Sequence, residues 1–180
     1  EFHALLQRER VTVLNQTPSA FKVLIEADRS RTEHIAHLRV IVFGGEALDL
    51  QSLAPWVEKY GDEAPELVNM YGITETTVHV TYRRVRREDV RTPNGSLIGV
   101  PIPDLQVYLA DSAGELVPIG VPGEMFVGGA GVALGYVNRP ELTEARFVER
   151  RWAPPGRGRL YRSGDLARRR ADGDLEYLGR

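Results

Sequence analysis

The hydrophobic pattern of this chain changes near Gly95, and that change constrains the fold more than any other feature of the sequence. Before Gly95, apolar residues recur at helical spacing or form short continuous runs, a pattern typical of helices alternating with buried strands. After it, short strands alternate with glycine and proline turns, which favours a small β barrel or sandwich. We therefore predict an α/β subdomain over 1–94 and a small distorted β barrel over 95–180, joined through the polar segment Arg91–Ser96.

Local patterns predict the elements of each half. Helices are expected over 1–10, from a capping Ser19 to Ala27, and from Ser52 to Tyr60. Strands are expected over 11–14, 38–43, 67–71, 105–110, 124–127, 158–163, 167–170 and 175–178. The last two strands flank Asp172-Gly173, a strong hairpin signal. The basic segment 83–87, followed at once by acidic residues, is interpreted as a solvated connector.

Composition excludes several classes of function. The chain carries 23 basic and 25 acidic residues, a formal net charge of −2, so it lacks the clustered positive excess that nucleic-acid binding requires. It has no cysteine, which excludes disulfides, a thiol nucleophile and a cysteine-based zinc site, and which fits a reducing compartment. No apolar run is long enough to span a membrane. We expect a cytoplasmic protein with no nucleic-acid and no membrane partner.

A strand followed by a glycine turn and a carboxylate occurs twice in the first half. The first turn, 44–46, ends on Glu46, and the second, 72–75, ends on Glu75. In open parallel sheets, ligands bind at the carboxyl ends of strands, where glycine lets the backbone approach them. Backbone amides and the Thr74 hydroxyl would bond phosphate oxygens, and Glu75 would hold a bridging Mg²⁺. The alternative is that both turns only connect strands.

Asp165 is a second candidate for ligand binding. It follows Gly164, and we expect it directly after a glycine turn. A carboxylate accepts hydrogen bonds on two oxygens, so it is the residue type that takes two ribose hydroxyls. The alternative is an Asx turn that closes a hairpin, and on this residue alone that alternative is favoured.

A series of motifs resembles the core motifs of adenylate-forming enzymes, in their order and spacing, over essentially the whole chain. Asn69–Thr77 (NMYGITETT) resembles the Tyr-Gly-x-Thr-Glu motif, and Tyr161–Leu166 (YRSGDL) resembles a later one. The other matching segments are 120–136, 139–147 and 173–180. The chain looks most like the amino-acid-activating adenylation domains of nonribosomal peptide synthetases. This resemblance implies part of a flavodoxin-like α/β layer followed by the barrel, with the nucleotide site between them.

The resemblance implies a role for each residue of the nucleotide site. Thr74 would contact the α-phosphate of ATP, Glu75 would hold Mg²⁺ and Asp165 would bind the ribose hydroxyls. Tyr71 would stack on the adenine ring. The remaining expected contacts, which border adenine or lie beside the nucleoside, are Gly45, Glu46, Asn69, Tyr177 and Arg180.

The resemblance also places the pocket for the amino acid. Its six specificity positions fall on Asn15, Val42, Gly44, Met70, Val78 and His79, a set that resembles the pattern associated with threonine. The chemistry is compatible, because Asn15 and His79 offer polar partners to a hydroxyl while the apolar positions would pack a methyl group. The alternative is that Val42 and Val78 are plain core residues and His79 is a satisfied buried histidine.

The implied enzyme is an AMP-forming ligase. An amino-acid carboxylate would attack the α-phosphorus of ATP, and the aminoacyl adenylate would pass to the phosphopantetheine thiol of a carrier protein. Positioning and charge neutralisation would supply the catalysis. Two alternatives stay open: an acyl-CoA or aryl-acid ligase of the same superfamily, and a non-catalytic fragment used as a binding or structural module.

Parts of the family pattern are missing from this sequence. The glycine-rich loop with its lysine, the aspartate for the substrate amino group and the C-terminal subdomain with the catalytic lysine are absent, and Lys22 and Lys59 lie in no matching context. We therefore expect a fragment of the N-terminal core that needs the remaining parts of the domain and forms no adenylate alone. An MbtH-like partner would dock near Ala153; an ordinary proline-glycine surface loop is an equal alternative.

Overall fold

The chain divides into two compact units. The computed structural model describes residues 1–92, 95–153 and 159–180. The first unit comprises Glu1–Met70 and Arg83–Leu97, and the second comprises Tyr71–Tyr82 and Ile98–Arg180. The segment Tyr71–Tyr82, which holds one of the two glycine turns, thus groups with the second unit rather than with the residues before it. Residues 93 and 94 of the expected boundary lie outside the described residues.

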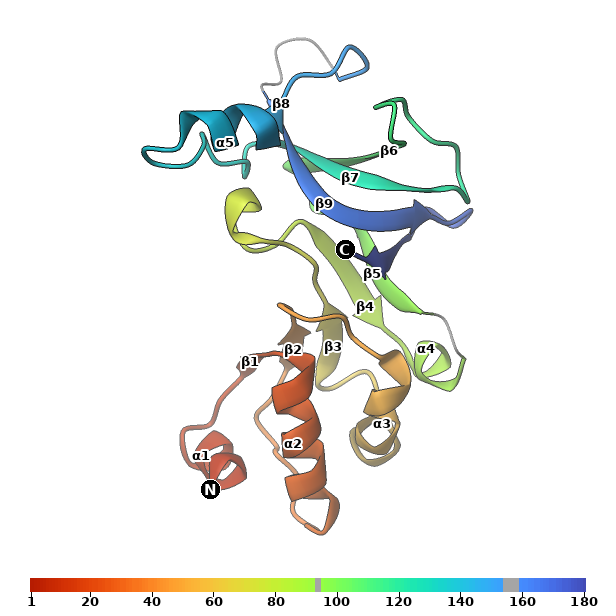
Figure 1. Cartoon of the computed structure of the whole chain (residues 1–180). Coiled ribbons are helices and arrows are strands. Elements are labelled where there is room, and N and C mark those ends of the chain that lie inside the picture. The colour runs from red at the N-terminus through yellow and green to blue at the C-terminus, as the bar shows by residue number, and fades with distance from the viewer. Residues whose placement is uncertain (93–94, 154–158) are drawn as a thin grey trace. The chain divides into compact units, whose positions relative to one another are not determined.

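The first unit is built on a sheet of strands β1 to β4 (Figure 1). Its parallel strands are β1 (Val13–Gln16), β2 (Val40–Phe43) and β3 (Glu66–Asn69), and β3 also pairs antiparallel with the second half of β4 (Thr81–Val85). Its helices are α1 (Phe2–Arg8), α2 (Pro18–Arg29), α3 (Ala54–Tyr60), which follows a 3-10 turn at Leu50–Leu53, and α4 (Arg87–Arg91). The predicted α/β class is confirmed.

An aromatic cluster forms the centre of this unit. The ring of Phe21 on α2 lies 4.9 Å from the rings of both Phe43 on β2 and Trp56 on α3. All three side chains are at most 1 % exposed. Burying such a side chain contributes about 1.5–3 kcal/mol, so these contacts hold the two helices against the sheet.

Helix α2 begins earlier than the sequence predicts. Its N-cap is Thr17, whose hydroxyl accepts a hydrogen bond from the Ala20 amide at 3.3 Å, and Pro18 occupies the first turn. The prediction of Ser19 as the cap is therefore wrong. Ser19 instead donates its hydroxyl to Glu46, 27 positions along the chain. The predicted end of α3 is confirmed, because Gly61 follows it with a φ of 81°.

A buried carboxylate, Asp28, joins three helices of the first unit. Its Oδ1 lies 2.9 Å from Nε2 of His3 on α1 and accepts a hydrogen bond of 2.9 Å from the hydroxyl of Tyr60 on α3. Its Oδ2 accepts from Nζ of Lys59 at 2.7 Å. Asp28 is 2 % exposed, and a charge so deeply buried is tolerated only when partners satisfy it.

In the part of the second unit that the structure describes, a β sheet is accompanied by one short α-helix (Figure 1). Its strand order is β5-β10-β9-β7-β6, the first half of β4 pairs with β5, and β8 pairs with β9. The strands are β5 (Ser96–Pro101), β6 (Leu105–Ala110), β7 (Pro122–Gly129), β8 (Phe147–Val148), β9 (Leu160–Arg169) and β10 (Leu175–Gly179), and the helix is α5 (Pro140–Arg146). Over the described strands this path is open, so the β-rich half is confirmed without closure into a barrel.

Strand β9 corrects the prediction about Asp165. The sequence suggests two strands separated by a glycine turn, but β9 runs unbroken from Leu160 to Arg169 with Asp165 inside it. Gly164 has a φ of 77°, and the pairing of β7 with β9 shifts register between Glu124 and Phe126. This irregularity is a bulge, which re-aims side chains without ending a strand. The predicted hairpin at Asp172-Gly173 is confirmed, since β9 and β10 pair antiparallel.

The prediction that the basic segment 83–87 is a solvated connector is wrong. The segment forms the end of β4 and the start of α4. Asp89 is 8 % exposed, and it accepts from Nη2 of Arg83 at 2.6 Å and from the Arg86 amide at 2.8 Å. The alternation of charges hid a strand because the arginine stems pack while their head groups pair.

Among the described residues, no helix has the length and apolar character needed to cross a membrane.

Candidate functional site

The turn after β3 folds back on itself around Gly72. A Cβ atom at Gly72 would lie 2.1 Å from the carbonyl oxygen of Val78, so no other residue fits without moving the backbone. The amide of Val80 donates to the carbonyl of Tyr71 at 2.7 Å and closes the turn. Between these points a short 3-10 turn, Thr74–Thr76, carries the predicted phosphate and metal residues.

The end of this turn has a strained backbone. Thr77 and Val78 have φ values of 58° and 68°, in the left-handed region that β-branched residues rarely adopt. Amide hydrogen bonds from Val78 to the carbonyl of Ile73, at 3.2 Å, and from His79 to the carbonyl of Thr77, at 2.8 Å, hold this conformation. Such strain persists where the surrounding structure over-determines it, and it clusters at ligand sites.

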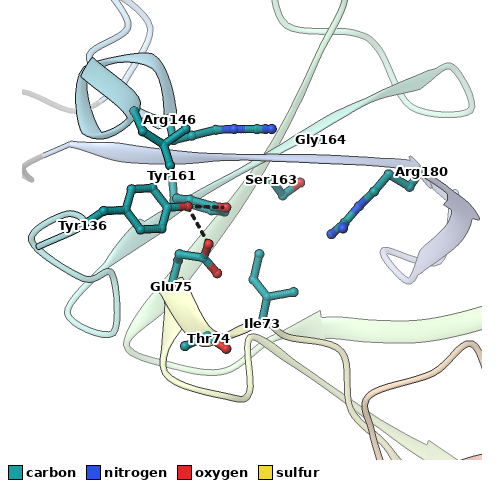
Figure 2. Close-up of a pocket in the computed structure, with 10 residues that line it drawn as sticks. Ile73, Thr74, Glu75, Tyr136, Arg146, Tyr161, Ser163, Gly164 and Arg180 are labelled. Carbon is teal, nitrogen blue, oxygen red and sulfur yellow. Dashed lines mark hydrogen bonds between the residues drawn. The ribbon is translucent and has the colours of Figure 1, made fainter. Parts of the chain in front are cut away.

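A pocket of about 670 Å³ opens beside Glu75 in the second unit (Figure 2). It is lined by Ile73, Thr74, Glu75, Tyr136, Leu142, Arg146, Tyr161, Ser163, Gly164 and Arg180. Three of these residues, Thr74, Glu75 and Arg180, are predicted from the sequence. The structure therefore brings the predicted phosphate and metal residues to the same pocket as one of the predicted nucleoside residues.

The Glu75 carboxylate is held by a tyrosine from another part of the unit. The hydroxyl of Tyr136 donates to Oε1 of Glu75 at 2.5 Å and lies 3.3 Å from the hydroxyl of Tyr161 (Figure 2). Partial burial acts to raise the pKa of Glu75, but the bond from Tyr136 and further hydrogen bonds outweigh it and hold that pKa below its ordinary value. The carboxylate is therefore ionised at neutral pH and is suited to a cation.

Asp165 is buried at 2 % exposure and lies in a network of hydrogen bonds. Its Oδ2 accepts from the hydroxyl of Tyr71 at 2.6 Å, and its Oδ1 accepts from Nε of Arg180 at 2.8 Å. Its own amide donates to Oγ of Ser163 at 3.0 Å. The hydrogen bond to Asp165, with the attraction of that carboxylate, raises the pKa of Arg180 above its ordinary value. The Asx-turn alternative is wrong, because Asp165 lies within a strand.

The two tyrosines predicted to lie near the nucleoside are neighbours in the structure. The rings of Tyr71 and Tyr177 have centroids 5.8 Å apart and are tilted by 34°. Burial raises the pKa of Tyr71 far above its ordinary value, and the bond to Asp165 raises it further. Tyr71 therefore stays a hydrogen-bond donor at neutral pH, and its ring lies beside the carboxylate predicted to bind ribose.

The other glycine turn lies in the first unit, after β2. Gly45 has a φ of 83°, which favours glycine even though a Cβ would only touch Thr17 at 3.7 Å. Glu46 accepts hydrogen bonds from the hydroxyl of Ser19 and from its amide, the latter at 3.0 Å. These two bonds lower the pKa of Glu46 below its ordinary value. Oε2 of the Glu46 side chain thus binds the first turn of α2.

Asn69, predicted to border adenine, is buried at the end of β3. It is 2 % exposed, and its Nδ2 donates to the carbonyl of Leu97 at 2.7 Å. Within the first unit, its amide thus ties the end of β3 to β5. Asn69 therefore has a structural role, in addition to the predicted contact with adenine.

The predicted specificity positions are divided between the units. In the first unit, Asn15 on β1 pairs in register with Val42 on β2, and Gly44 and Met70 directly follow the ends of β2 and β3. The Met70 amide donates to the carbonyl of Phe43 at 2.9 Å, which continues the pairing of the two strands. These four positions therefore gather at one edge of the sheet, as parallel strands dictate.

The last two specificity positions, Val78 and His79, lie in the second unit. Val78 is 62 % exposed, so it is not a core residue. Nδ1 of His79 is buried and has no hydrogen-bond partner among the residues that the structure describes. The alternative of a satisfied buried histidine therefore lacks a partner for that atom.

Sequence reasoning missed Tyr136, Arg146, Tyr161 and Ser163. Tyr136 follows Gly135 in a matching motif, but it lies 61 positions from Glu75 along the chain. No local sequence pattern predicts a hydrogen bond between them. Arg146 ends α5 and lines the same pocket. A tyrosine inside a glycine-rich loop was the available signal, since large amphipathic rings in such loops usually find a polar partner.

The donor set is compatible with a magnesium site that includes substrate. In the described part of the chain, no group of three or more histidine, cysteine, aspartate or glutamate side chains is placed to hold a metal. Mg²⁺ does not need such a group, because it commonly binds one or two carboxylates, several waters and substrate phosphates. An ionised Glu75 at the edge of an open pocket fits that role.

The model of one enzyme family, described as AMP-binding enzyme, matches residues 1–137. The chain belongs to this family. It is 51 % identical over 181 residues to a dimodular nonribosomal peptide synthase of Bacillus subtilis, covering 99 % of this chain and 8 % of that protein. It is 48 % identical over 175 residues to syringomycin synthase SyrB1 of Pseudomonas syringae pv. syringae, covering 97 % of this chain and 28 % of that protein.

A solved structure of PA1221, a nonribosomal peptide synthetase protein containing adenylation and carrier domains, matches this AMP-binding chain with a TM-score of 0.87. The two are 30 % identical, and the match covers 99 % of this chain and 35 % of PA1221. The chain thus spans a minor part of each relative. The predicted resemblance to the N-terminal core of adenylation domains is confirmed, and so is the predicted fold class.

Proposed function

We propose that this AMP-binding chain supplies the nucleotide face of an ATP-dependent adenylation domain that activates an amino acid. The observation that carries the proposal is the grouping, within the second unit, of an ionised Glu75 beside the pocket with Asp165 and its partner Arg180. These are a cation ligand, an acceptor for two hydroxyls and a positive charge. Together they suit the metal ion, the ribose hydroxyls and the negative charge of a magnesium nucleotide.

The nucleoside end would be bound by the residues around Asp165. Its two oxygens accept from Tyr71 and Arg180, and each carboxylate oxygen can accept a further bond from a ribose hydroxyl. The ring of Tyr71, held by its hydroxyl, would offer a flat face to adenine. On the motif resemblance, Gly45, the backbone of Glu46 and Asn69 are also proposed to border the base.

The phosphate end would lie against the 3-10 turn. The exposed Thr74 hydroxyl would bond the α-phosphate, and Glu75 would hold Mg²⁺. Bound there, Mg²⁺ would neutralise charge on the phosphates during transfer. Arg146, whose charge acts on Glu75, lines the same pocket and would add positive potential near the transferred group.

The reaction that we propose has two steps. The carboxylate of the amino acid attacks the α-phosphorus of ATP, and pyrophosphate leaves with the electron pair of the broken bond. The phosphopantetheine thiol of a carrier protein then attacks the aminoacyl carbonyl and releases AMP. The residues of this chain contribute by holding the nucleotide in line for attack, which is the main source of rate in phosphoryl transfer.

Threonine or a threonine-like amino acid is the proposed substrate. Asn15 and His79 would bond its hydroxyl, and Val42, Met70 and Val78 would pack its methyl group, with Gly44 leaving room beside them. The buried, unpartnered Nδ1 of His79 supports this assignment, since such an atom costs free energy until it finds a partner.

Two partners belong to this proposal. A carrier protein domain would receive the amino acid, and an MbtH-like protein would dock near Ala153. Trp152, the neighbour of Ala153, donates from Nε1 to the carbonyl of Gly114 at 2.8 Å, so this end of the segment is anchored. The rest of the segment, 154–158, lies outside the described residues. If co-expression with an MbtH-like protein changes neither solubility nor activity of the full-length protein, this partner is excluded.

The nucleotide site is tested by calorimetric ATP binding and pyrophosphate exchange in the full-length adenylation domain. We expect Asp165→Asn to weaken ATP binding about tenfold or more. The control is Asp172→Asn, the same substitution in an exposed hairpin outside the proposed site, which should leave ATP binding unchanged. A wild-type domain that binds no ATP and exchanges no pyrophosphate with any amino acid would be a non-catalytic module. Equal exchange with threonine, valine and serine would overturn the substrate assignment alone.

A further inference from the structure

The loop between β7 and α5 is bonded to the Glu75 turn at three points. The Ala133 amide donates to the carbonyl of Glu75 at 2.9 Å, and the Thr77 hydroxyl donates to the carbonyl of Gly131 at 2.8 Å. The third bond runs from the hydroxyl of Tyr136 to the Glu75 carboxylate. The loop therefore holds both the backbone and the side chain of the residue proposed to bind the metal.

Tyr136 is itself fixed by its surroundings. Its amide donates to Oγ1 of Thr143 on α5 at 2.9 Å, and its ring meets the ring of Phe147 edge-on at 5.5 Å. The preceding Gly135 leaves room for this arrangement, because a Cβ there would lie 2.5 Å from Cγ2 of Thr143. The ring thus has one well-defined position, which a positioning residue requires.

A second phenol supports the first. Tyr161 on β9 is 4 % exposed, and its ring lies 5.1 Å from that of Phe147. Its hydroxyl lies 3.3 Å from the hydroxyl of Tyr136. A phenol has one proton to donate, and Tyr136 donates its proton to Glu75 at 2.5 Å. The Tyr136 oxygen is then left to accept a hydrogen bond from the Tyr161 hydroxyl (Figure 2).

We propose that Tyr136 is a positioning residue for Glu75: its hydroxyl occupies one side of the carboxylate and turns the remaining oxygen lone pairs towards a magnesium nucleotide. The assignment rests on the proposed function. Residues that orient a metal ligand from behind typically affect metal affinity by about 10- to 100-fold. The role belongs to the hydroxyl, since the ring packs on Phe147 whether or not the oxygen is present.

The test is Tyr136→Phe in the full-length adenylation domain, which removes the hydroxyl and keeps the ring. Calorimetry measures ATP affinity with Mg²⁺ and again with a chelator in its place. We expect the gain in ATP affinity due to Mg²⁺ to fall by about tenfold, while affinity without Mg²⁺ stays within about twofold. In pyrophosphate exchange, the Mg²⁺ concentration for half-maximal rate should rise by a similar factor, with the KM for the amino acid unchanged.

Two further variants separate positioning from packing. Tyr161→Phe should weaken the Mg²⁺ gain less than Tyr136→Phe, because the short bond of 2.5 Å to the Glu75 carboxylate comes from Tyr136. Tyr82→Phe makes the same change at an exposed residue outside the pocket lining and should behave as wild type. Equal loss of ATP affinity with and without Mg²⁺ in Tyr136→Phe would assign it a structural role only and would overturn the inference.

The outcome also distinguishes this inference from the proposed function. If the wild-type domain shows a Mg²⁺-dependent gain that Glu75→Gln abolishes, while Tyr136→Phe keeps it in full, the inference is wrong and the proposed function stands. If the wild-type domain binds ATP no better with Mg²⁺ than without it, the proposed metal site fails, and the inference fails with it.

Discussion

The two glycine turns of this protein look alike in sequence and differ in what holds their carboxylates. Glu46 follows β2 and belongs to the first unit. Glu75 follows β3 along the chain but belongs to the second unit. Both have a pKa below the ordinary value. Glu46 owes this to Ser19 at the start of the adjacent helix, whereas Glu75 is held by Tyr136 from a distant loop. The same local pattern thus yields a helix contact in one unit and a pocket residue in the other.

The difference shows that a carboxylate after a glycine turn is not by itself a metal site. Glu46 is exposed, and the amide and hydroxyl of Ser19 both bond its Oε2, which ties the side chain to the start of α2. Glu75 lines a pocket, and the Tyr136 hydroxyl bonds its Oε1. What separates the two is the tertiary partner, and substitutions in each turn test this difference.

The largest expected effect concerns the two carboxylates themselves. In the full-length domain, Glu75→Gln should lower pyrophosphate exchange by about 100-fold, because the amide loses the charge that a cation requires. Glu46→Gln, the matched change in the other turn, should lower it by at most about threefold, since only its backbone would border the nucleotide. Similar losses in both variants would contradict the distinction between the turns.

The next effect concerns the two glycines. Gly72→Ala forces a Cβ to within 2.1 Å of a backbone oxygen, and we expect it to cost about 3 kcal/mol or more of stability. Gly45→Ala has free space but a φ of 83°, so it should cost about 1–2 kcal/mol. Thermal unfolding of the full-length domain ranks the two variants. A smaller loss at Gly72 than at Gly45 would mean that the backbone of Val78 moves away easily.

A smaller effect is expected at the start of α2. Thr17→Ala removes the N-cap hydroxyl and should cost about 1 kcal/mol. Ser19→Ala, which lies outside the cap, should cost less, because its bond to Glu46 is exposed to water. Thermal unfolding distinguishes them. If Ser19→Ala is the more damaging, the capping role belongs to Ser19 after all.

The smallest effect is a titration at high pH. Burial, together with the neighbouring Asp28, raises the pKa of Tyr60 to about 12 from an ordinary value of 10.0. A group whose folded pKa is raised stabilises fully below the unfolded value, so this contribution is lost as the pH rises from about 10 towards 12. Ultraviolet titration should show the step, and Tyr60→Phe should remove it. Tyr71 and Tyr161 in the second unit should ionise later still.

Sequence patterns predicted well where the determinants are local. Helix α3 ends at Gly61 because only glycine accepts that φ cheaply, and the hairpin at Asp172-Gly173 follows from the same chemistry. They failed where packing overrides propensity. Arg83 and Asp89 look like surface charges, but they pair with each other, so a strand and a helix form around them.

The site divides in the same way. The residue types proposed to bind the nucleotide, Thr74, Glu75, Asp165 and Arg180, were visible in the motifs. Their geometry was not visible. Asp165 was assigned to a turn, since Gly164 looks like a strand terminator and turned out to be a bulge inside β9.

Sequence patterns were sufficient to predict the family, most of the helices and strands before Tyr71 and the residue types proposed to bind the nucleotide, because these depend on residue type and near neighbours. Tertiary structure alone decided which groups meet. Tyr71 reaches Asp165 across 94 positions, and Tyr136 reaches Glu75 across 61. Such pairs depend on how a whole sheet packs and registers its strands, and no short pattern encodes that sum of many weak contacts.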